Sequence, residues 1–406
     1  MGKRGWRFSI ILIVIISFFL FLKSEFIKKD YEKEIEKINK EIAEFGLEWR
    51  AGVTPLMLLP QEERDKRLGA FVPLYEDPKK FIKVEIRLLV PPSLDWRKFE
   101  GKNWLTGVKS QGGCGSCWAF SIIGTIEAIY KIERNKPYIN PDLSEQDLVS
   151  CSPAGSCSGG SYFLAAKYIK ENGVVSEDCF PYSGKDESCN LCPNWAKKLA
   201  KISDYGFVTQ SRADKTAIES ALQDGPLSFW MQVYSDFYAY TGGIYEPTPS
   251  AIYRGDHAIV LIGYNNRENY WICKNSWGED WGENGYFKIR MGVCGTGKWV
   301  LKVEGVNIAN RPPMLKSIGE KTTKEGVKIT IQLKATDPDN DPLIYGARFL
   351  PPGAEFDENK GIFTWTPAYT QAGEYTVRFS VSDGTFEDFE DVRIIVINVK
   401  KGKGKF

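Results

Sequence analysis

The chain of 406 residues has a single histidine, His257. Because histidine is the side chain whose ordinary pKa lies closest to neutrality, one residue alone can supply an imidazole for proton transfer near pH 7. The chain also lacks an excess of charge, with 53 Lys and Arg against 52 Asp and Glu, so its composition implies no nucleic acid or other polyanion as a partner. It has no Asn-x-Ser/Thr sequon, and glycosylation therefore gives no clue to topology.

An apolar segment opens the chain. Residues 8–22 are almost all apolar and follow a basic start at residues 1–7. This length suits the apolar region of a signal peptide better than a membrane span, which needs about 20 residues. No small-x-small cleavage motif follows, so residues 1–22 are predicted to be either a signal peptide or an uncleaved signal anchor that attaches the protein to the membrane. Either one places the body of the protein outside the cytoplasm, secreted or on the outer face of the cell membrane, where disulfides persist.

Three short motifs stand in order along the middle of the chain. They are QGGCGSCW at residues 111–118, GDHAIV at 255–260 and KNSWG at 274–278, so His257 follows Cys117 by 140 positions (257 − 117) and Asn275 follows it by 158 (275 − 117). Apolar residues after Cys117 recur at helical spacing, which predicts that Cys117 begins a helix whose dipole favours a thiolate. His257 can take the thiol proton and remain beside the sulfur as an imidazolium, and Asn275 can orient its ring. The pattern predicts nucleophilic catalysis by cysteine.

With these motifs the chain resembles the papain-like cysteine peptidases. The resemblance implies that the Gln111 amide and the Cys117 N–H form an oxyanion hole, and that the Trp277 indole covers the hydrogen bond between His257 and Asn275. The predicted catalytic residues are Cys117, His257, Asn275 and Gln111. The residues predicted to bind or border the substrate are Gly159, Gly160, Ser161, Tyr162, Asp256 and Trp277.

The nine cysteines fit one reactive thiol and four disulfides, as expected of an exported protein. The resemblance pairs Cys114 with Cys157 and Cys151 with Cys189. For the other four cysteines, proximity along the chain favours Cys179 with Cys192 and Cys273 with Cys294, although four cysteines allow three connectivities. A zinc site made of the two Cys-x-x-Cys pairs is disfavoured, because 72 residues (189 − 117) separate Cys117 from Cys189, far more than in a zinc ribbon. No metal is assigned to the site.

The domain organisation follows from the resemblance and from residue patterns. Residues 23–89 are predicted to be an inhibitory prosegment with an amphipathic helix over residues 34–45, and a plain stalk is the alternative. Residues 90–308 resemble the peptidase domain, which implies an α+β fold of two lobes. The helical lobe carries the cysteine and faces a β-rich lobe that carries the histidine, with the substrate in the cleft between them.

An all-β module is predicted beyond a linker at residues 309–313. Alternating strands around Ile329, Val377 and Ile394, separated by Pro, Gly and Asp turns, predict an immunoglobulin-like or cadherin-like sandwich over residues 314–399, before a basic tail at 400–406. Carboxylates of Asp337, Asp339 and Asp341 fit calcium, and a turn is the alternative. No other cofactor is predicted.

The sequence thus predicts a cysteine endopeptidase that is made as an exported zymogen. Its expected partners are a polypeptide substrate, its own prosegment and the membrane at the N-terminus. The lack of a second histidine disfavours exopeptidases that hold a substrate terminus with loop histidines. Two alternatives stay open, an adhesion protein with an idle peptidase fold and an acyl transferase or amidase with the same nucleophile.

Overall fold

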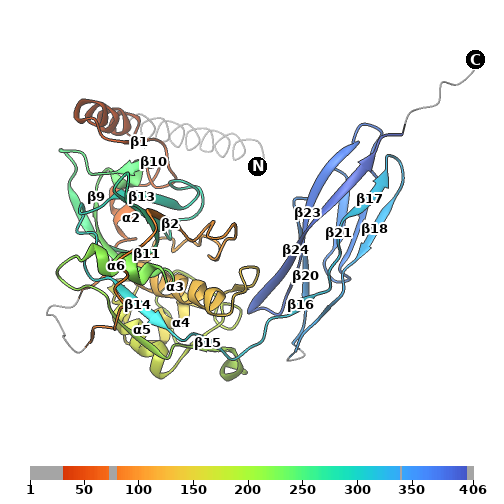
Figure 1. Ribbon diagram of the computed structural model, residues 1–406, viewed down its shortest axis with the longest axis horizontal. Helices are drawn as coiled ribbons and strands as arrows, with labels where there is room; N and C mark the ends of the chain where they lie inside the picture. Colours follow the sequence, from red (N-terminus) through yellow and green to blue (C-terminus); the bar gives the residue numbers. More distant parts are fainter. Residues whose placement is uncertain (1–30, 73–79, 339–340, 400–406) are drawn as a thin grey trace, which may run out of the picture.

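A computed structural model describes residues 31–72, 80–338 and 341–399. The predicted α+β fold of two lobes, followed by a β-sandwich, is confirmed (Figure 1). One hydrophobic core lies under the large sheet, another lies among the helices, and a third lies inside the C-terminal module.

The helical lobe is built around α3 (Cys117–Glu133), with α4 (Glu145–Cys151) and α5 (Tyr162–Glu171) beside it. Residues 117–131 of α3 are all buried, because the helix lies between the two lobes and packs on both. The lobe also contains short elements, namely β3 (Asn140–Pro141), β4 (Gly155–Ser156), β5 (Gly159–Gly160), β6 (Val174–Val175), η2 (Trp195–Lys198), β7 (Leu199–Lys201) and β15 (Asn307–Ile308).

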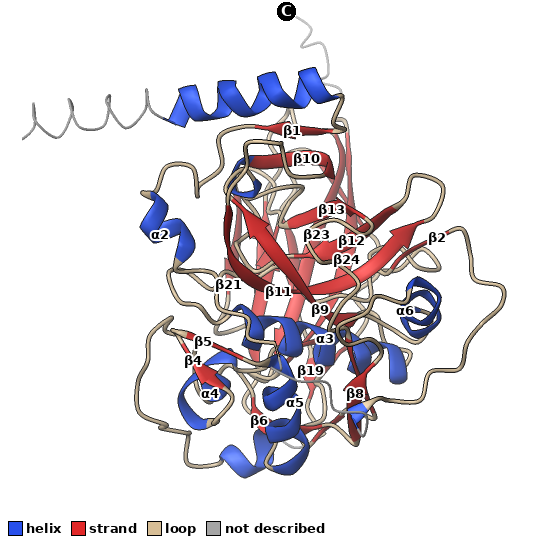
Figure 2. Cartoon of the chain, turned by 90° about the vertical axis from the view of Figure 1, so that its left-hand side faces the viewer, coloured by secondary structure: helices blue, strands red, loops and turns tan. Residues whose placement is uncertain are grey.

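The second lobe is a large, mostly antiparallel sheet with α6 (Lys215–Leu222) and η3 (Phe237–Ala239) packed near it (Figure 2). In sheet order the strands are β1 (Trp49–Ala51), β10 (Tyr240–Tyr245), β13 (Tyr286–Arg290), β12 (Tyr270–Lys274), β11 (Tyr253–Asn265), β9 (Leu227–Tyr234), β14 (Leu301–Glu304) and β8 (Asp204–Phe207), and β2 (Ser93–Asp95) pairs with β11. The alternating pattern of β9 is confirmed, since Leu227, Phe229, Met231 and Val233 all enter the sheet core. Trp230 points to the opposite side, into the core of the helical lobe.

The N-terminal segment is part of this folded body. Residues 31–45 are helical and lie across β1 and β10 (Figure 2), with Ile38 and Ile42 in the sheet core, whereas Phe45 at the end of the helix is 55% exposed. The next helix is α2 (Gln61–Asp65), whose buried Arg64 donates to Glu34 Oε1 at 3.1 Å and to the carbonyl of Met57 at 3.0 Å. Further along, Leu88 and Leu89 are each 94% exposed. The predicted end of the prosegment is therefore open to solvent.

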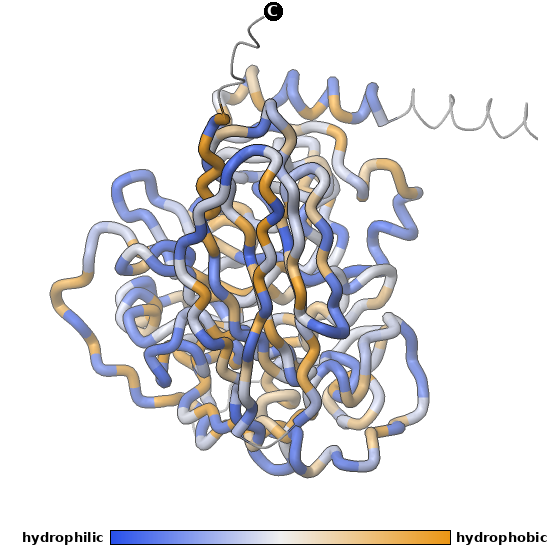
Figure 3. The backbone as a smooth tube through the Cα atoms, turned by 90° about the vertical axis from the view of Figure 1, so that its right-hand side faces the viewer, coloured by the Kyte–Doolittle hydropathy of each residue, from blue (hydrophilic) through white to orange (hydrophobic). Residues whose placement is uncertain are grey.

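The C-terminal module packs two sheets around Trp365, Phe363 and Phe379. One sheet has the order β17 (Lys321–Lys324), β24 (Phe386–Ile397), β23 (Gly373–Ser382), β20 (Ile344–Arg348), and the other has the order β18 (Ile329–Gln332), β22 (Ile362–Trp365), β21 (Ala354–Asp357), while β16 (Met314–Leu315) pairs with β19 (Ala335–Thr336). Hydrophilic and hydrophobic residues alternate along these strands (Figure 3), as a half-buried strand requires.

The module is docked on the helical lobe through one hairpin. Strand β24 pairs with β3, and the N–H of Asp142 donates to the carbonyl of Thr385 at 3.0 Å. The Phe386 side chain, 1% exposed, belongs to the core of the helical lobe and stacks on Tyr130 of α3 with ring centroids 5.5 Å apart. The predicted linker at residues 309–313 stays a prediction; the module has a hydrophobic core of its own, and the pairing of β24 with β3 and the Phe386 side chain join it to the helical lobe.

Two predictions fall partly outside the described residues. Residues 1–22, the predicted signal peptide or anchor, lie outside them, and within the described ranges no helix is long and apolar enough to cross a membrane. Of the three aspartates in the proposed calcium loop, Asp339 also lies outside, while Asp341 N–H donates to Asp337 Oδ1 at 3.0 Å, a bond typical of a turn. Calcium binding stays a prediction.

Candidate active site

Cys117 is the first residue of α3, as the sequence predicted. The Cys114–Cys157 disulfide holds the loop that leads to it, and Cys117 itself is 0% exposed. Burial raises the pKa of the Cys117 thiol to about 12, although the backbone N–H groups of Ala258, Trp118, Gly69 and Cys117 work in the opposite direction. One of these four groups, Gly69, belongs to the N-terminal segment.

His257 lies on β11 and Asn275 directly follows β12, so two neighbouring strands bring them together. His257 Nε2 is 2.8 Å from Asn275 Oδ1, and the N–H of Ser276 donates to the same oxygen at 2.8 Å. The bond from Ser276 identifies this atom as the amide oxygen, so Nε2 carries the hydrogen and donates it. The lone pair of the neutral ring is then on Nδ1, which has no hydrogen-bond partner among the described residues. His257 is therefore in the tautomer that can accept a proton at Nδ1.

Burial sets the charge state of this pair. It lowers the pKa of His257 to about 4, against the hydrogen bond from the ring to Asn275, which raises it. With the pKa of Cys117 at about 12, both shifts favour a neutral thiol and a neutral imidazole near pH 7. The sequence predicted a thiolate and an imidazolium. That ion pair is disfavoured while the site is covered, because neither charge is solvated.

Trp277 lies against the histidine, as the resemblance implied. Its ring centroid is 4.8 Å from that of His257, at 34° between planes. Trp277 is itself packed by Tyr238 at 5.6 Å and by Trp281 at 4.9 Å. This aromatic cluster excludes water from the bond between His257 and Asn275 and fixes the ring plane.

Gln111 is buried and held by both ends of its amide. The Oγ of Ser276 donates to Oε1 at 2.6 Å, and Nε2 donates to the carbonyl of Cys114 at 2.8 Å. Nε2 also donates to the carbonyl oxygen of Arg67 at 2.9 Å. The predicted oxyanion donor is thus occupied by a peptide carbonyl of the N-terminal segment.

The N-terminal segment lies in the cleft between the lobes. The N–H groups of Gly69 and Ala70 donate to the carbonyl of Asp256 at 2.9 and 3.2 Å. Gly160 N–H donates to Gly69 O at 2.8 Å, and Phe71 N–H donates to Gly160 O at 2.7 Å, in a parallel bridge between Ala70 and Gly160. A Cβ on Gly160 would lie 2.4 Å from Trp118, and one on Gly159 would lie 2.4 Å from Phe71. These two positions need glycine because the backbone and the ring approach so closely.

The other predicted pocket residues line this cleft in different ways. Ser161 caps α5, since its Oγ accepts from the N–H of Leu164 at 3.4 Å. Tyr162 is 2% exposed and its hydroxyl donates to the carbonyl of Trp299, so its ring is fixed in the core of the helical lobe rather than free. Asp256 accepts a hydrogen bond from the Tyr253 hydroxyl at 2.8 Å, and burial raises the pKa of its carboxyl.

Sequence reasoning missed a charge cluster next to the site, in which Glu127 and Glu145 are buried and Lys109 and Asp142 are partly exposed. Lys109 Nζ is 3.4 Å from Glu127, 3.1 Å from Glu145 and 2.6 Å from Asp142. Burial lowers the pKa of Lys109, but these carboxylates outweigh it and the pKa is raised well above its usual value. Lys274, the residue before Asn275, donates to Thr106 Oγ1 at 3.2 Å. These residues are far apart in the sequence and meet only through the fold, so no local motif indicates the cluster.

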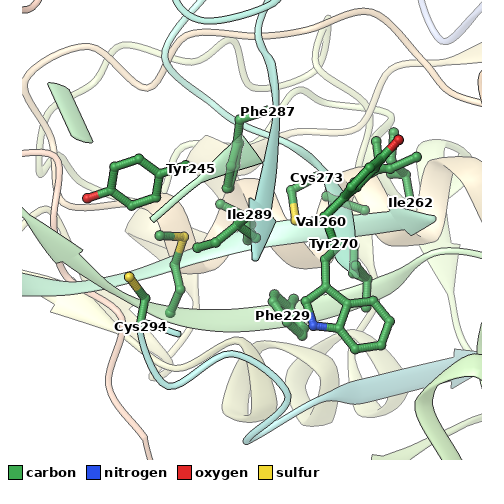
Figure 4. Close-up of a cluster of buried hydrophobic side chains, with 14 of the residues drawn as sticks. Phe229, Tyr245, Val260, Ile262, Tyr270, Cys273, Phe287, Ile289 and Cys294 are labelled. Atoms are coloured by element: carbon green, nitrogen blue, oxygen red, sulfur yellow. The ribbon is translucent and has the colours of Figure 1, made fainter. Parts of the chain in front are cut away.

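Three of the four predicted disulfides are present, namely Cys114–Cys157, Cys151–Cys189 and Cys179–Cys192. The prediction that Cys273 pairs with Cys294 is wrong, since both are free and buried. Cys273 is on strand β12, where its cross-strand partners are Leu261 and Phe287. Cys294 is in a loop, and its backbone carbonyl accepts a hydrogen bond from the N–H of Gln232. Figure 4 shows their sulfur atoms well apart, with Ile289 drawn between them.

Fold and site together define a two-lobed protein with a buried thiol, whose cleft is covered by its own N-terminal segment. Residues 90–302 match the profile of the papain family cysteine proteases, and residues 312–399 match a putative Ig domain. The chain belongs to the papain family of cysteine proteases.

Several relatives show how far the similarity extends. The chain is 39% identical over 218 residues to pro-cathepsin H of Bos taurus, covering 50% of this chain and 62% of that protein. It is 38% identical over 216 residues to macrodontain-1 of Ananas macrodontes, covering 51% of this chain and 94% of that protein. The digestive procathepsin L2 proteinase from Tenebrio molitor larval midgut has a similar structure, with a TM-score of 0.61 at 31% identity over 70% of this chain and 94% of that one.

Proposed function

We propose that the protein is a cysteine endopeptidase made as an inactive zymogen, with the segment at residues 23–89 as its inhibitor. The observation that carries the proposal is the hydrogen bond from Gln111 Nε2 to the carbonyl of Arg67 at 2.9 Å. A peptide carbonyl of the segment is thus bound by the donor that an oxyanion would need, six residues before Cys117 in the chain (117 − 111). The match to procathepsins supports the zymogen.

In the mechanism that this geometry supports, the Cys117 thiol gives its proton to Nδ1 of His257. The sulfur attacks the peptide carbonyl carbon, and the oxygen that gains charge is held by Gln111 Nε2 and the Cys117 N–H. Nδ1–H then protonates the leaving amine as the C–N bond breaks. In the second half, His257 takes a proton from water, the hydroxide attacks the thioester, and the acid leaves as the proton returns to the sulfur. Asn275 keeps the ring oriented throughout.

The burial of the thiol under the N-terminal segment explains why the zymogen is inactive. The backbone N–H of Gly69 acts on the Cys117 thiol, which is 0% exposed, so water that would solvate the ion pair is excluded while the segment is in the cleft. Removal of the segment lets water reach both groups, which moves the pKa of Cys117 down and that of His257 up. Export through residues 1–22 accords with the three disulfides, which persist in oxidising compartments.

The test uses protein from which residues up to 89 have been removed, with denatured casein as the substrate. We expect cleavage by the wild type and by Cys294→Ala, a buried thiol outside the cleft, and none by Cys117→Ser. If neither the wild type nor Cys294→Ala cleaves casein, an adhesion protein with an idle peptidase fold is the better description. If products appear only when an amine acceptor is added, and carry that amine, the protein is an acyl transferase.

A further inference from the structure

The backbone of Gly160 holds an extended chain by both of its polar groups. Its N–H binds the carbonyl of Gly69 and its carbonyl binds the N–H of Phe71, so the two bonds flank Ala70. An extended substrate would use the same two groups. Residues that face each other across paired strands direct their side chains to the same face, in parallel and antiparallel pairs alike. The substrate residue opposite Gly160 therefore directs its side chain where Ala70 directs its own.

The side chain of Ala70 is buried in the helical lobe. It is 2% exposed and belongs to the same hydrophobic cluster as Tyr162, Trp230 and Ala258, which we name the Trp230 pocket. Trp230 and Ala258 are cross-strand partners in β9 and β11. Both face the helical lobe, because the residues beside them along their strands, such as Phe229 and Ile259, belong to the other core.

The walls of the Trp230 pocket are held in place from behind. The Tyr162 hydroxyl donates to the carbonyl of Trp299, which keeps the Tyr162 ring in the core. The Trp230 ring lies over Gly295, where an added Cβ would be 2.5 Å from Cζ3. The hydrogen bond of Tyr162 and the close packing of Trp230 on Gly295 limit the movement of both rings, and in a core packed in this way a side chain larger than a methyl group costs free energy.

From these contacts we infer that the protease selects substrates with a small side chain, of the size of alanine, at the residue that pairs with Gly160. Trp230 is the residue that sets this limit, and the inference rests on the proposed peptidase function. A leucine or phenylalanine at this position would overpack the pocket. One methylene group in a hydrophobic pocket already changes kcat/KM by about tenfold or more, and the side chains of leucine and phenylalanine exceed that of alanine by about three and six carbon atoms.

A peptide series tests the inference on the processed protein. Fluorogenic peptides differ only at one position, which carries Gly, Ala, Val, Leu or Phe, and each position near the cleaved bond is varied in turn. We expect one position at which Ala exceeds Leu and Phe by at least about tenfold in kcat/KM. Trp230→Ala should raise kcat/KM for the peptides with Leu or Phe at that position by a similar factor, relative to kcat/KM for the peptide with Ala. Trp195→Ala, which removes an exposed tryptophan, should leave the ratios unchanged.

The results separate the inference from the proposed function. Cleavage with no position that prefers Ala, or a Trp230→Ala profile equal to that of the wild type, overturns the inference and leaves the peptidase intact. If Trp230→Ala does not fold, as judged by titration of Cys117 with an alkylating inhibitor, Trp230→Leu takes its place. Absence of cleavage of casein and of all peptides sinks the proposed function instead.

A second measurement needs no catalysis. In the full-length chain, Ala70→Leu should force the segment out of the Trp230 pocket and raise the rate at which iodoacetamide alkylates Cys117 by about tenfold or more. Ala43→Leu, on the exposed side of the N-terminal helix, is the matched control and should leave that rate unchanged. Equal alkylation rates in the two variants would show that the pocket accepts leucine, contrary to the inference.

Discussion

Gln111 donates a hydrogen bond from Nε2 to the carbonyl oxygen of Arg67 at 2.9 Å, which joins the N-terminal segment to the predicted oxyanion donor. Because Ser276 Oγ and the carbonyl of Cys114 hold the other hydrogen-bonding positions of the same amide, the side chain is positioned before any substrate arrives. Such positioning matters, since loss of one oxyanion donor typically lowers the rate by about 10² to 10³.

Alkylation of Cys117 should report the state of the cleft. In the full-length chain the thiol is fully buried with its pKa at about 12, so iodoacetamide at pH 6 should react slowly. After removal of residues up to 89 we expect the rate to rise at least about 100-fold, because the thiolate gains water and an imidazolium neighbour. Peptide mapping of the alkylated cysteine provides the measurement. Equal rates before and after removal would contradict the role of the segment as a cover.

The carboxylate of Asp65 should make the binding of the N-terminal segment to the cleft dependent on pH. Burial works to raise the pKa of Asp65, but hydrogen bonds from Arg254, Tyr238 and Gln61 outweigh it, and the pKa is lowered below 3.8. A group whose pKa is lowered by docking stabilises the docked segment above its usual pKa and loses that effect as the pH falls through the lowered value. Acidification below about pH 4 should therefore loosen the segment, as seen in the alkylation of Cys117.

Asp65→Asn removes that charge at every pH. Because Asp65 is partly exposed, we expect the segment to bind about 1 kcal/mol more weakly near pH 7, or roughly fivefold in Cys117 alkylation. Glu63→Gln is the control, since Glu63 forms an exposed pair with Lys66 on the same short helix. A pH profile of the Asp65→Asn protein identical to that of the wild type would argue against this carboxylate as the pH-sensitive group.

Phe386, a residue of the C-terminal module, should stabilise the protease domain. Its side chain is 1% exposed in the core of the helical lobe, so Phe386→Ala leaves a cavity beside Tyr130. We expect a loss of about 3 kcal/mol in the free energy of unfolding of that domain, measured by denaturant titration with tryptophan fluorescence. Phe349→Ala, in which the removed ring is 71% exposed, should change stability by less than about 0.5 kcal/mol. Equal stability of the two variants would mean that the hairpin does not dock.

The thiol count should distinguish the observed disulfides from the predicted ones. Six of the nine cysteines form bridges, and Cys117, Cys273 and Cys294 are free. Alkylation in denaturant without reductant should add three groups per chain, and two groups in Cys117→Ser, as measured by intact mass. A single added group per chain would show that Cys273 and Cys294 are paired after all.

The parts of the site that the sequence could predict are those carried by contiguous motifs. Cys117, His257, Asn275 and Gln111 each lie in a stretch whose residues also fix the local backbone. In the structure His257 bonds Asn275, Ser276 bonds Gln111, and the backbone N–H of Ala258, next to His257, acts on the Cys117 thiol. The start of α3 followed from helical spacing, and the strands from alternation. Two disulfides followed from the family resemblance.

The remainder depends on contacts between distant segments. Trp230 interrupts the apolar alternation of β9 on the side away from the sheet core, and only the packing of a second lobe makes that side a pocket wall. Burial raises the pKa of Cys117 and lowers that of His257, and one of the backbone N–H groups that oppose the first shift comes from Gly69, 48 positions upstream of the cysteine (117 − 69). Proximity along the chain misled the pairing of Cys273, because β12 points its side chain into the sheet core.

The module contacts α3 at Tyr130, thirteen positions beyond Cys117 (130 − 117), and at about 1.5 Å per residue this is roughly 20 Å from the nucleophile. The cleft and the module therefore contact opposite ends of α3. A partner bound to the module would thus lie at a fixed distance from the nucleophile, and that distance, as well as the size of the pocket, would limit which peptide bonds of the partner reach Cys117.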